Sequence, residues 1–347
     1  MRTRTNRALA AVGTSVLLTA VAACGGGDDG DASADSGLTT LVYAQPTPES
    51  MAFYAYVVAD ELGFFEEEGL AVELAPSSED VPTSTLVVSG NADIGIAGGA
   101  EVLFAAATGR EIAAVYDVLT ASAEGLVVPG DSDVQSVADL DGATIGMASD
   151  EERPLVGTAL EAEGLSLDDV ELVVVGTSGP TLANELQSGN LDAFAGSLLD
   201  FSAMQAAGIE TRNITPDALD ESPTQVMVVS REKLESDREA IEGFLRAYAK
   251  ATHLGLEDPD RVEEILRERV PDEWQDEAFG EALFSAGLDL WHPVGDQYGE
   301  LRPDAWSSLQ DQLIAFGELD EPVDIDGIID DSLLEAANDW DRDSVGN

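Results

Sequence analysis

Apolar runs typical of buried strands alternate along the chain with segments of helical spacing. The run 38–44 (LTTLVYA) predicts a strand, and the nearly continuous apolar stretch 51–62 predicts a largely buried helix. Further strands are expected at 71–75, 92–97, 111–120, 124–129, 143–148, 170–175 and 225–230, with helices at 81–89, 100–108, 149–163 and 181–188. After residue 230 the spacing is helical, at 236–256, 259–269, 273–290 and 303–316. This alternation predicts an α/β fold.

One segment of the chain occurs twice. Residues 89–93 (SGNAD) match residues 188–192 (SGNLD), and each copy stands between a predicted helix and a predicted strand. Gly and Asn tolerate the left-handed backbone that ends helices. Two copies of one helix–strand–helix unit predict two similar lobes, with a ligand held in a cleft beyond the carboxyl ends of their strands.

The first 23 residues have the pattern of an export signal. Three arginines precede an apolar run at 8–23, which is shorter than the roughly 20 residues that a membrane span needs. The end of this run, VAAC, resembles the bacterial lipoprotein signal, which is cleaved before a cysteine that is then lipidated; Cys24 is the only cysteine. Residues 24–37 are rich in Gly, Asp and Ser and predict a flexible tether. We therefore expect an exported protein held at the outer face of the cell membrane by a lipid anchor.

Several motifs resemble the solute-binding proteins of ABC importers, in the family that takes nitrate, sulfonates, taurine and pyrimidine precursors of thiamine. They are 59–74 (ADELGFFEEEGLAVEL), 90–95 (GNADIG), 109–115 (GREIAAV) and 137–146 (VADLDGATIG). The resemblance covers about 38–338 and implies a two-lobed periplasmic-binding-protein-like (type II) fold with a cleft and a two-strand hinge. Lobe 1 would take 38–121 plus 231–347 and lobe 2 would take 122–230. The implied partners are ABC permease subunits, and we expect a monomer whose lobes close on the ligand.

Catalytic and cofactor motifs are absent from the sequence. It has no G-x-S-x-G, no cysteine after Cys24 and no phosphate-binding glycine loop, and His253 and His292 have no partner at metal-ligand spacing. We therefore predict no enzyme activity, metal or cofactor. The alternative within this fold is synthesis of the thiamine pyrimidine with a lysine-bound pyridoxal phosphate, but the only lysines, Lys233 and Lys250, lie in the late helical part.

The formal net charge of −53 excludes nucleic-acid binding. We interpret the acidity as a solvated surface, with adaptation to high salt as the alternative.

Candidate ligand contacts are the polar, aromatic and glycine residues in the turns that follow the strands. They are Gln45, Thr47, Glu49, Phe53, Tyr54, Gly98, Gly99, Glu101 and Tyr116 in the first lobe, and Ser149, Asp150, Arg153, Thr177, Ser178, Gly179, Ser197 and Asp200 in the second.

The charges near these turns bear on the ligand. An anion would need Arg, Lys or helix N-terminal amides, yet only Arg110, Arg153 and Arg212 lie between Cys24 and residue 231. Carboxylates at several turns favour a small nitrogen-bearing molecule, such as a thiamine-precursor-like pyrimidine, and the C-terminal segments also resemble those of heterocycle binders. The alternatives are a binder of a sulfonate, taurine or nitrate anion, and a ligand-sensing module for a membrane signalling partner.

Overall fold

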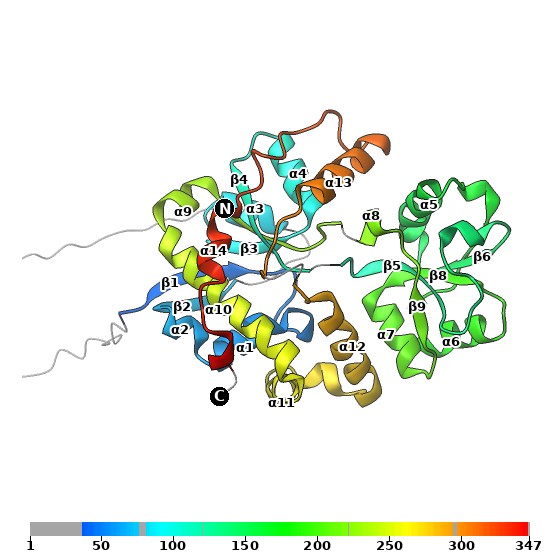
Figure 1. The fold of residues 1–347 in the computed structure, drawn as a ribbon, viewed down its shortest axis with the longest axis horizontal. Coiled ribbons are helices and arrows are strands. Elements are labelled where there is room, and N and C mark those ends of the chain that lie inside the picture. The colour runs from blue at the N-terminus through cyan, green and yellow to red at the C-terminus, as the bar shows by residue number, and fades with distance from the viewer. Residues whose placement is uncertain (1–36, 76–80, 120, 221, 294–296, 346–347) are drawn as a thin grey trace, which may run out of the picture. The chain divides into compact units, whose positions relative to one another are not determined.

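The computed structural model describes residues 37–75, 81–119, 121–220, 222–293 and 297–345 and places their strands in two five-stranded sheets (Figure 1). The first sheet has the order β2-β1-β3-β10-β4. Its strands are β1 (Thr39–Ala44), β2 (Leu70–Leu74), β3 (Ile94–Ala97), β4 (Ile112–Asp117) and β10 (Val226–Ser230). β1 runs parallel to β2 and β3, whereas β10 is antiparallel to β3 and β4.

The second sheet repeats this arrangement with the order β7-β6-β8-β5-β9. Its strands are β5 (Glu124–Pro129), β6 (Thr144–Met147), β7 (Glu171–Val174), β8 (Ala193–Ser197) and β9 (Thr211–Asn213). β6 is parallel to β7 and β8, and β5 is antiparallel to β8 and β9. β5 and β10 thus occupy equivalent places, each entered after the chain has crossed from the other sheet. The α/β prediction with two similar units is confirmed.

The repeated pentapeptide ends a helix and anchors the strand that follows. Its glycine has a positive φ in both copies, 72° in the first and 69° in the second, which an L side chain rarely adopts. Its aspartate then binds a neighbouring strand. Asp93 Oδ2 accepts from the N–H of Val42 (2.7 Å), and Asp192 Oδ2 accepts from the N–H of Thr144 (2.8 Å). The pentapeptide therefore has the same structural role in both sheets: it ends a helix and fixes the strand that follows.

Helices accompany both sheets. Those in the chain segments of the first are α1 (Tyr54–Glu61), α2 (Phe64–Glu67), α3 (Thr83–Val88), α4 (Gly99–Ala107), α9 (Arg231–Ser236), α10 (Arg238–Glu257), α11 (Pro259–Arg269), α12 (Glu277–Leu290), α13 (Pro303–Ala315) and α14 (Leu334–Ala337). Those in the segments of the second are α5 (Arg153–Ala162), α6 (Gly179–Gln187), α7 (Leu198–Ala206) and α8 (Asp217–Asp220). α10 packs against α1 and α14, and α12 packs against α7.

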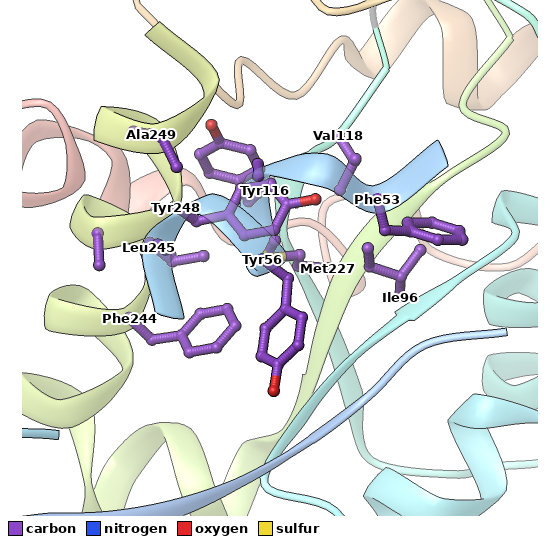
Figure 2. Packing of buried hydrophobic residues seen from close by; sticks show 14 of the residues in the cluster. Phe53, Tyr56, Ile96, Tyr116, Val118, Met227, Phe244, Leu245, Tyr248 and Ala249 are labelled. Atoms are coloured by element: carbon purple, nitrogen blue, oxygen red, sulfur yellow. The ribbon is translucent and has the colours of Figure 1, made fainter. Parts of the chain in front are cut away.

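An aromatic-rich core lies between α1, α10 and the first sheet. Figure 2 shows Tyr116 and Tyr248 within it, and their ring centroids are 6.1 Å apart in an edge-on arrangement. Phe244 stacks on Tyr248 at 6.2 Å. Such rings each bury a large apolar area, so this cluster contributes much of the stability of the first sheet and its helices.

Three predicted helices open with a 3-10 turn, and in the expected helix 149–163 this turn is Asp150–Glu152, before α5. The expected helix 51–62 opens with a 3-10 turn, Met51–Phe53, and the expected helix 273–290 is divided into a 3-10 turn, Pro271–Trp274, and α12. Short polar caps explain the last two of these starts. Ser50 Oγ accepts from the N–H of Ala52, and Asp276 Oδ1 accepts from the N–H of Phe279.

The expected signal, Cys24 and almost all of the tether lie outside the described residues. In the part of the chain that is described, no helix combines the length and apolar character needed to cross a membrane.

Candidate functional site

A cavity of about 440 Å³ is lined by segments from both sheets. This volume falls within the range of roughly 300–1,000 Å³ that small-molecule sites occupy. The lining comes from the turn after β1, the link into β5, the start of α7, the approach to β10, and α12 with the turn before it. Its members are Pro46, Thr47, Ser50, Met51, Ala52, Phe53, Leu119, Ala123, Glu124, Ser197, Leu198, Leu199, Gln225, Glu273, Leu283, Gly287, Leu290 and Trp291.

The turn after β1 is held by hydrogen bonds from inside and outside the turn. Gln45 Nε2 donates to the carbonyl oxygen of Pro48 at 2.8 Å. The N–H of Met51 donates to Glu273 Oε2 at 2.7 Å, across 222 residues of sequence. This bond satisfies an N–H at the start of a helical segment and joins the first turn of the lining to the segment before α12.

The start of α7 is fixed by a capping box. The N–H and Oγ of Ser197 both donate to Asp200 Oδ2, each at 2.9 Å. The N–H of Leu198 donates to the carbonyl oxygen of Ala123 at 2.7 Å. These bonds place Leu198 and Leu199 at the cavity beside the link that leads into β5.

Trp291 forms an aromatic wall of the cavity and is 4% exposed. Tyr54 lies behind it, with ring centroids 4.8 Å apart, and Tyr248 stacks on it at 6.0 Å. The hydroxyl of Tyr54 donates to the carbonyl oxygen of Thr252 at 3.0 Å, which fixes the supporting ring. A rigid indole face of this kind can stack with a flat ligand.

The charged side chains that line the cavity are both acidic. They are Glu124 and Glu273, and among the described lining residues there is no Lys, Arg or His. Burial raises the pKa of Glu124, and the negative charge of Glu152 raises it further. The described lining therefore offers hydrogen-bond acceptors in a largely apolar surround and contributes no cationic group for an anion.

A family model, NMT1/THI5-like, matches residues 50–262, which is more than half of the chain. The chain belongs to the NMT1/THI5-like family. It is 25% identical over 305 residues to the formylaminopyrimidine-binding protein of Halalkalibacterium halodurans, a match that covers 84% of this chain and 90% of that protein. It is 23% identical over 313 residues to a 4-amino-5-hydroxymethyl-2-methylpyrimidine phosphate synthase of Saccharomyces cerevisiae, covering 83% and 90%.

Among solved structures, the periplasmic aliphatic sulphonate binding protein SsuA from Escherichia coli superposes with a TM-score of 0.60. The sequence identity is 19%, and the match covers 84% of this chain and 91% of that one. The family resemblance predicted from the motifs and the periplasmic-binding-protein-like fold are both confirmed.

In this member of the NMT1/THI5-like family, the cavity gathers three of the predicted contacts, Thr47, Phe53 and Ser197. Tyr54 and Tyr116 are packed in the core, 1% and 2% exposed. Neither of them is among the described residues that line the cavity. Tyr54 packs on Trp291, and Tyr116 packs on Tyr248, which in turn stacks on Trp291.

The remaining predicted residues of the first lobe are engaged elsewhere. Glu49 Oε1 pairs with Arg269 at 2.6 Å, and Glu101 Oε1 accepts from the N–H of Ser84 at 2.6 Å. Gln45 is buried in its own turn.

The two glycines at the start of α4 meet the segment before β10. The N–H of Gly99 donates to the carbonyl oxygen of Pro223, and a Cβ at Gly99 would lie 2.3 Å from that oxygen. Gly98 caps α4 and lies near Thr224. Close backbone approach therefore accounts for Gly99, whereas a Cβ at Gly98 would make only an ordinary contact, 3.6 Å from the carbonyl oxygen of Thr224.

The second lobe's other candidates lie outside the cavity lining. Ser149 donates to Glu152 through its N–H (2.7 Å), while Asp150 and Arg153 form an exposed pair at 3.3 Å. Gly179 starts α6 so close to α7 that a Cβ would lie 2.4 Å from the carbonyl oxygen of Ala203. The last three are Thr177 and Ser178, which are exposed, and Asp200, which caps α7.

Sequence reasoning missed the lining supplied by α12 and by the links between the sheets. Leu283, Gly287 and Leu290 lie on α12, and Trp291 caps its C-terminus. No strand ends directly before this helix, so the strand-end rule gives no reason to choose these residues. The only feature of the sequence that pointed to this part of the lining was the tryptophan, a rare residue here with 4 in 347 residues.

Neither lysine lies at the cavity. Lys233 Nζ pairs with Asp93 at 2.9 Å and Asp237 at 3.2 Å, and Lys250 Nζ pairs with Glu68 at 3.0 Å. A lysine-bound cofactor in this cavity does not fit these positions. Within the described ranges, no group of three or more His, Cys, Asp or Glu side chains could hold a metal ion.

Proposed function

We propose that this chain is the solute-binding protein of an ABC importer and captures a small nitrogen-bearing organic molecule in the cavity lined by both sheets. A pyrimidine related to the thiamine precursors is the leading ligand class. The observation that carries the proposal is the lining itself, in which an indole wall and aliphatic side chains surround carboxylate and amide acceptors. The relative in Halalkalibacterium halodurans, a formylaminopyrimidine-binding protein, supports the same class.

Capture would proceed by closure of the lobes 38–121 plus 231–347 and 122–230. Two features support this: the chain crosses between the sheets before β5 and before β10, and the cavity takes its lining from both sides of those crossings. A permease must distinguish loaded from empty receptor, and closure supplies such a difference. The proposed anchor is an acylated Cys24, with export directed by residues 1–23.

A sulfonate ligand is the second candidate, because the chain has the fold of the Escherichia coli sulphonate binding protein. The lining argues against it, since Glu124 and Glu273 would face the anion without a cation among the described lining residues. An enzymatic role is suggested by the yeast pyrimidine phosphate synthase. The positions of the two lysines argue against that role for a lysine-bound cofactor.

A thermal-shift screen tests the proposal. The panel contains substituted aminopyrimidines, alkanesulfonates, taurine and nitrate, each at millimolar concentration. A ligand at a hundred times its Kd stabilises the folded state by about 2.7 kcal/mol, so a true ligand raises the midpoint clearly. We expect aminopyrimidines to do so. Stabilisation by the anions alone would overturn the proposed ligand class.

A further inference from the structure

The hydroxyl groups that line the cavity are engaged by the protein. Ser197 Oγ donates to Asp200 at 2.9 Å, and Thr47 Oγ1 donates to the carbonyl oxygen of Pro48 at 3.0 Å. Ser50 Oγ accepts from the N–H of Ala52 at 3.2 Å. The hydrogen-bond donors of Ser197 and Thr47 are therefore already used.

The hydrogen-bond acceptors that line the cavity are, in contrast, only partly used by the protein. Within the described part of the chain, the carboxylate of Glu124 has no hydrogen-bond or ion-pair partner, and Gln225 Oε1 is buried without one. Glu273 uses one oxygen, Oε2, to hold Met51. Glu124 is exposed, so a ligand N–H can reach its carboxylate, whereas Gln225 Oε1 has no contact with solvent.

The rest of the lining is apolar and leaves room for a ring. Leu283, Leu290 and Trp291 face the same cavity, and a Cβ added at Gly287 would meet nothing within 4 Å. The cavity thus combines an apolar surface with a surplus of acceptors and a net negative charge.

We propose that the cavity selects organic cations, with an apolar ring system packed on Trp291 and one positively charged nitrogen group whose N–H donors are accepted by the carboxylate of Glu124. This inference rests on the proposed function, because it takes the cavity as the ligand site, and it deepens that function by choosing the charge of the ligand. Glu124 is then the residue that determines specificity for charge. Hydrogen bonds between ionised partners are about twice as strong as neutral ones, so a cation gains most from this site.

A series of three benzene derivatives isolates charge from shape. Benzamidinium, benzamide and benzenesulfonate share one ring and carry a positive, neutral and negative group. Affinities are measured at pH 7 and low salt by calorimetry, with ligand-detected NMR for weak binders. We expect benzamidinium to bind about tenfold or more tightly than benzamide, a difference of roughly 1.4 kcal/mol, and benzenesulfonate to bind weakest.

The variant Glu124→Gln tests the residue. It should reduce the affinity for benzamidinium to that for benzamide and leave benzamide unchanged. Glu171→Gln is the matched control, because it removes the same charge from an exposed position on β7 outside the cavity lining. That variant should bind all three probes as the unaltered protein does. Because Glu124 retains contact with solvent, added salt should also weaken the binding of benzamidinium more than the binding of benzamide.

The outcomes separate this inference from the proposed function. Equal affinity for benzamidinium and benzamide would overturn the selection of cations and leave a solute-binding cavity in place. Tightest binding of benzenesulfonate would overturn it in favour of an anion. If Glu124→Gln loses affinity for benzamide and benzamidinium equally, Glu124 has a structural role and does not select charge. If none of the three binds to folded protein at millimolar concentration, the cavity is not a site for organic solutes, and the proposed function fails as well.

Discussion

The indole of Trp291 packs on the ring of Tyr54, with centroids 4.8 Å apart and planes inclined by 51°. Trp291 faces the cavity, whereas Tyr54 is 1% exposed and is fixed by its hydrogen bond to Thr252. The two rings therefore have different roles in the same wall of the cavity. In the proposed site, the first would supply the surface for a ligand, and the second would hold that surface in place.

This division predicts different effects of two substitutions. Trp291→Leu keeps an apolar side chain but removes the stacking face, which contributes on the order of 1–3 kcal/mol in aromatic–base contacts. The affinity for the best ligand should fall about tenfold or more by calorimetry. Tyr54→Phe keeps the ring and loses one buried hydrogen bond, so the free energy of unfolding should fall by about 1 kcal/mol with the affinity nearly unchanged. An unaltered affinity in Trp291→Leu would show that the ligand does not stack there.

Gly287 gives a test of the cavity that leaves the charges untouched. Its position on α12 lines the cavity, and an added Cβ would meet no atom within 4 Å. Gly287→Ala should raise the free energy of unfolding by roughly 0.5–1 kcal/mol, because alanine is the better helix former. Gly287→Leu should fill the cavity and abolish ligand binding in the same folded protein. Ser285→Leu, at an exposed position of α12, is the control. Retained binding in Gly287→Leu would place the ligand elsewhere.

Features that depend on local sequence could be predicted well. The glycine and asparagine of the pentapeptide at 89–93 and 188–192 predicted a helix stop before equivalent strands, and the bounds of β5 and α11 agree with the pattern. The two repeats led to the α/β fold, because a positive φ and a short buried strand are encoded within a few residues.

The site could be predicted only in part, because its chemistry depends on contacts across the whole chain. Turn residues such as Thr47 and Ser197 follow strand ends, and the fold rule finds them. Glu49 follows one too, but its carboxylate is engaged by Arg269, 220 residues away. Carboxylates at turns were therefore weak evidence for ligand contact, since caps and ion pairs also require them.

The proposed anchor predicts a change in where the protein is found. If acyl chains on Cys24 hold the protein at the membrane, Cys24→Ser should move it from the membrane fraction to the soluble fraction of an expressing bacterium. The ligand affinity of the purified protein should not change, because the proposed anchor and the proposed ligand site use different residues. Immunoblotting of both fractions measures the distribution. Membrane retention of the variant after a high-salt wash would contradict a lipid anchor at this residue.

A buried ion pair at the end of β4 predicts how stability depends on pH. Asp117 is 3% exposed in its side chain, and its Oδ2 accepts from Arg302 Nη2 at 3.2 Å. Burial raises the pKa of Asp117 to about 7, although Arg302 acts in the opposite direction. An aspartate in the unfolded chain has a pKa of about 3.9. Between these two values the folded state holds more protons than the unfolded state, so the free energy of unfolding contributed by Asp117 falls as the pH rises and levels off above about 7.

The variant Asp117→Asn should remove this dependence. Urea unfolding at pH 5.5 and pH 7.5 gives the loss of stability for each protein, and the unaltered protein should lose on the order of 1–2 kcal/mol more than the variant. The comparison is needed because the remaining acidic groups also titrate, and Asp141→Asn, at an exposed position, should behave as the unaltered protein does. Equal losses in the unaltered protein and Asp117→Asn would mean that Arg302 keeps Asp117 ionised across the whole range. In that case the attraction within the pair outweighs the cost of burying its charge.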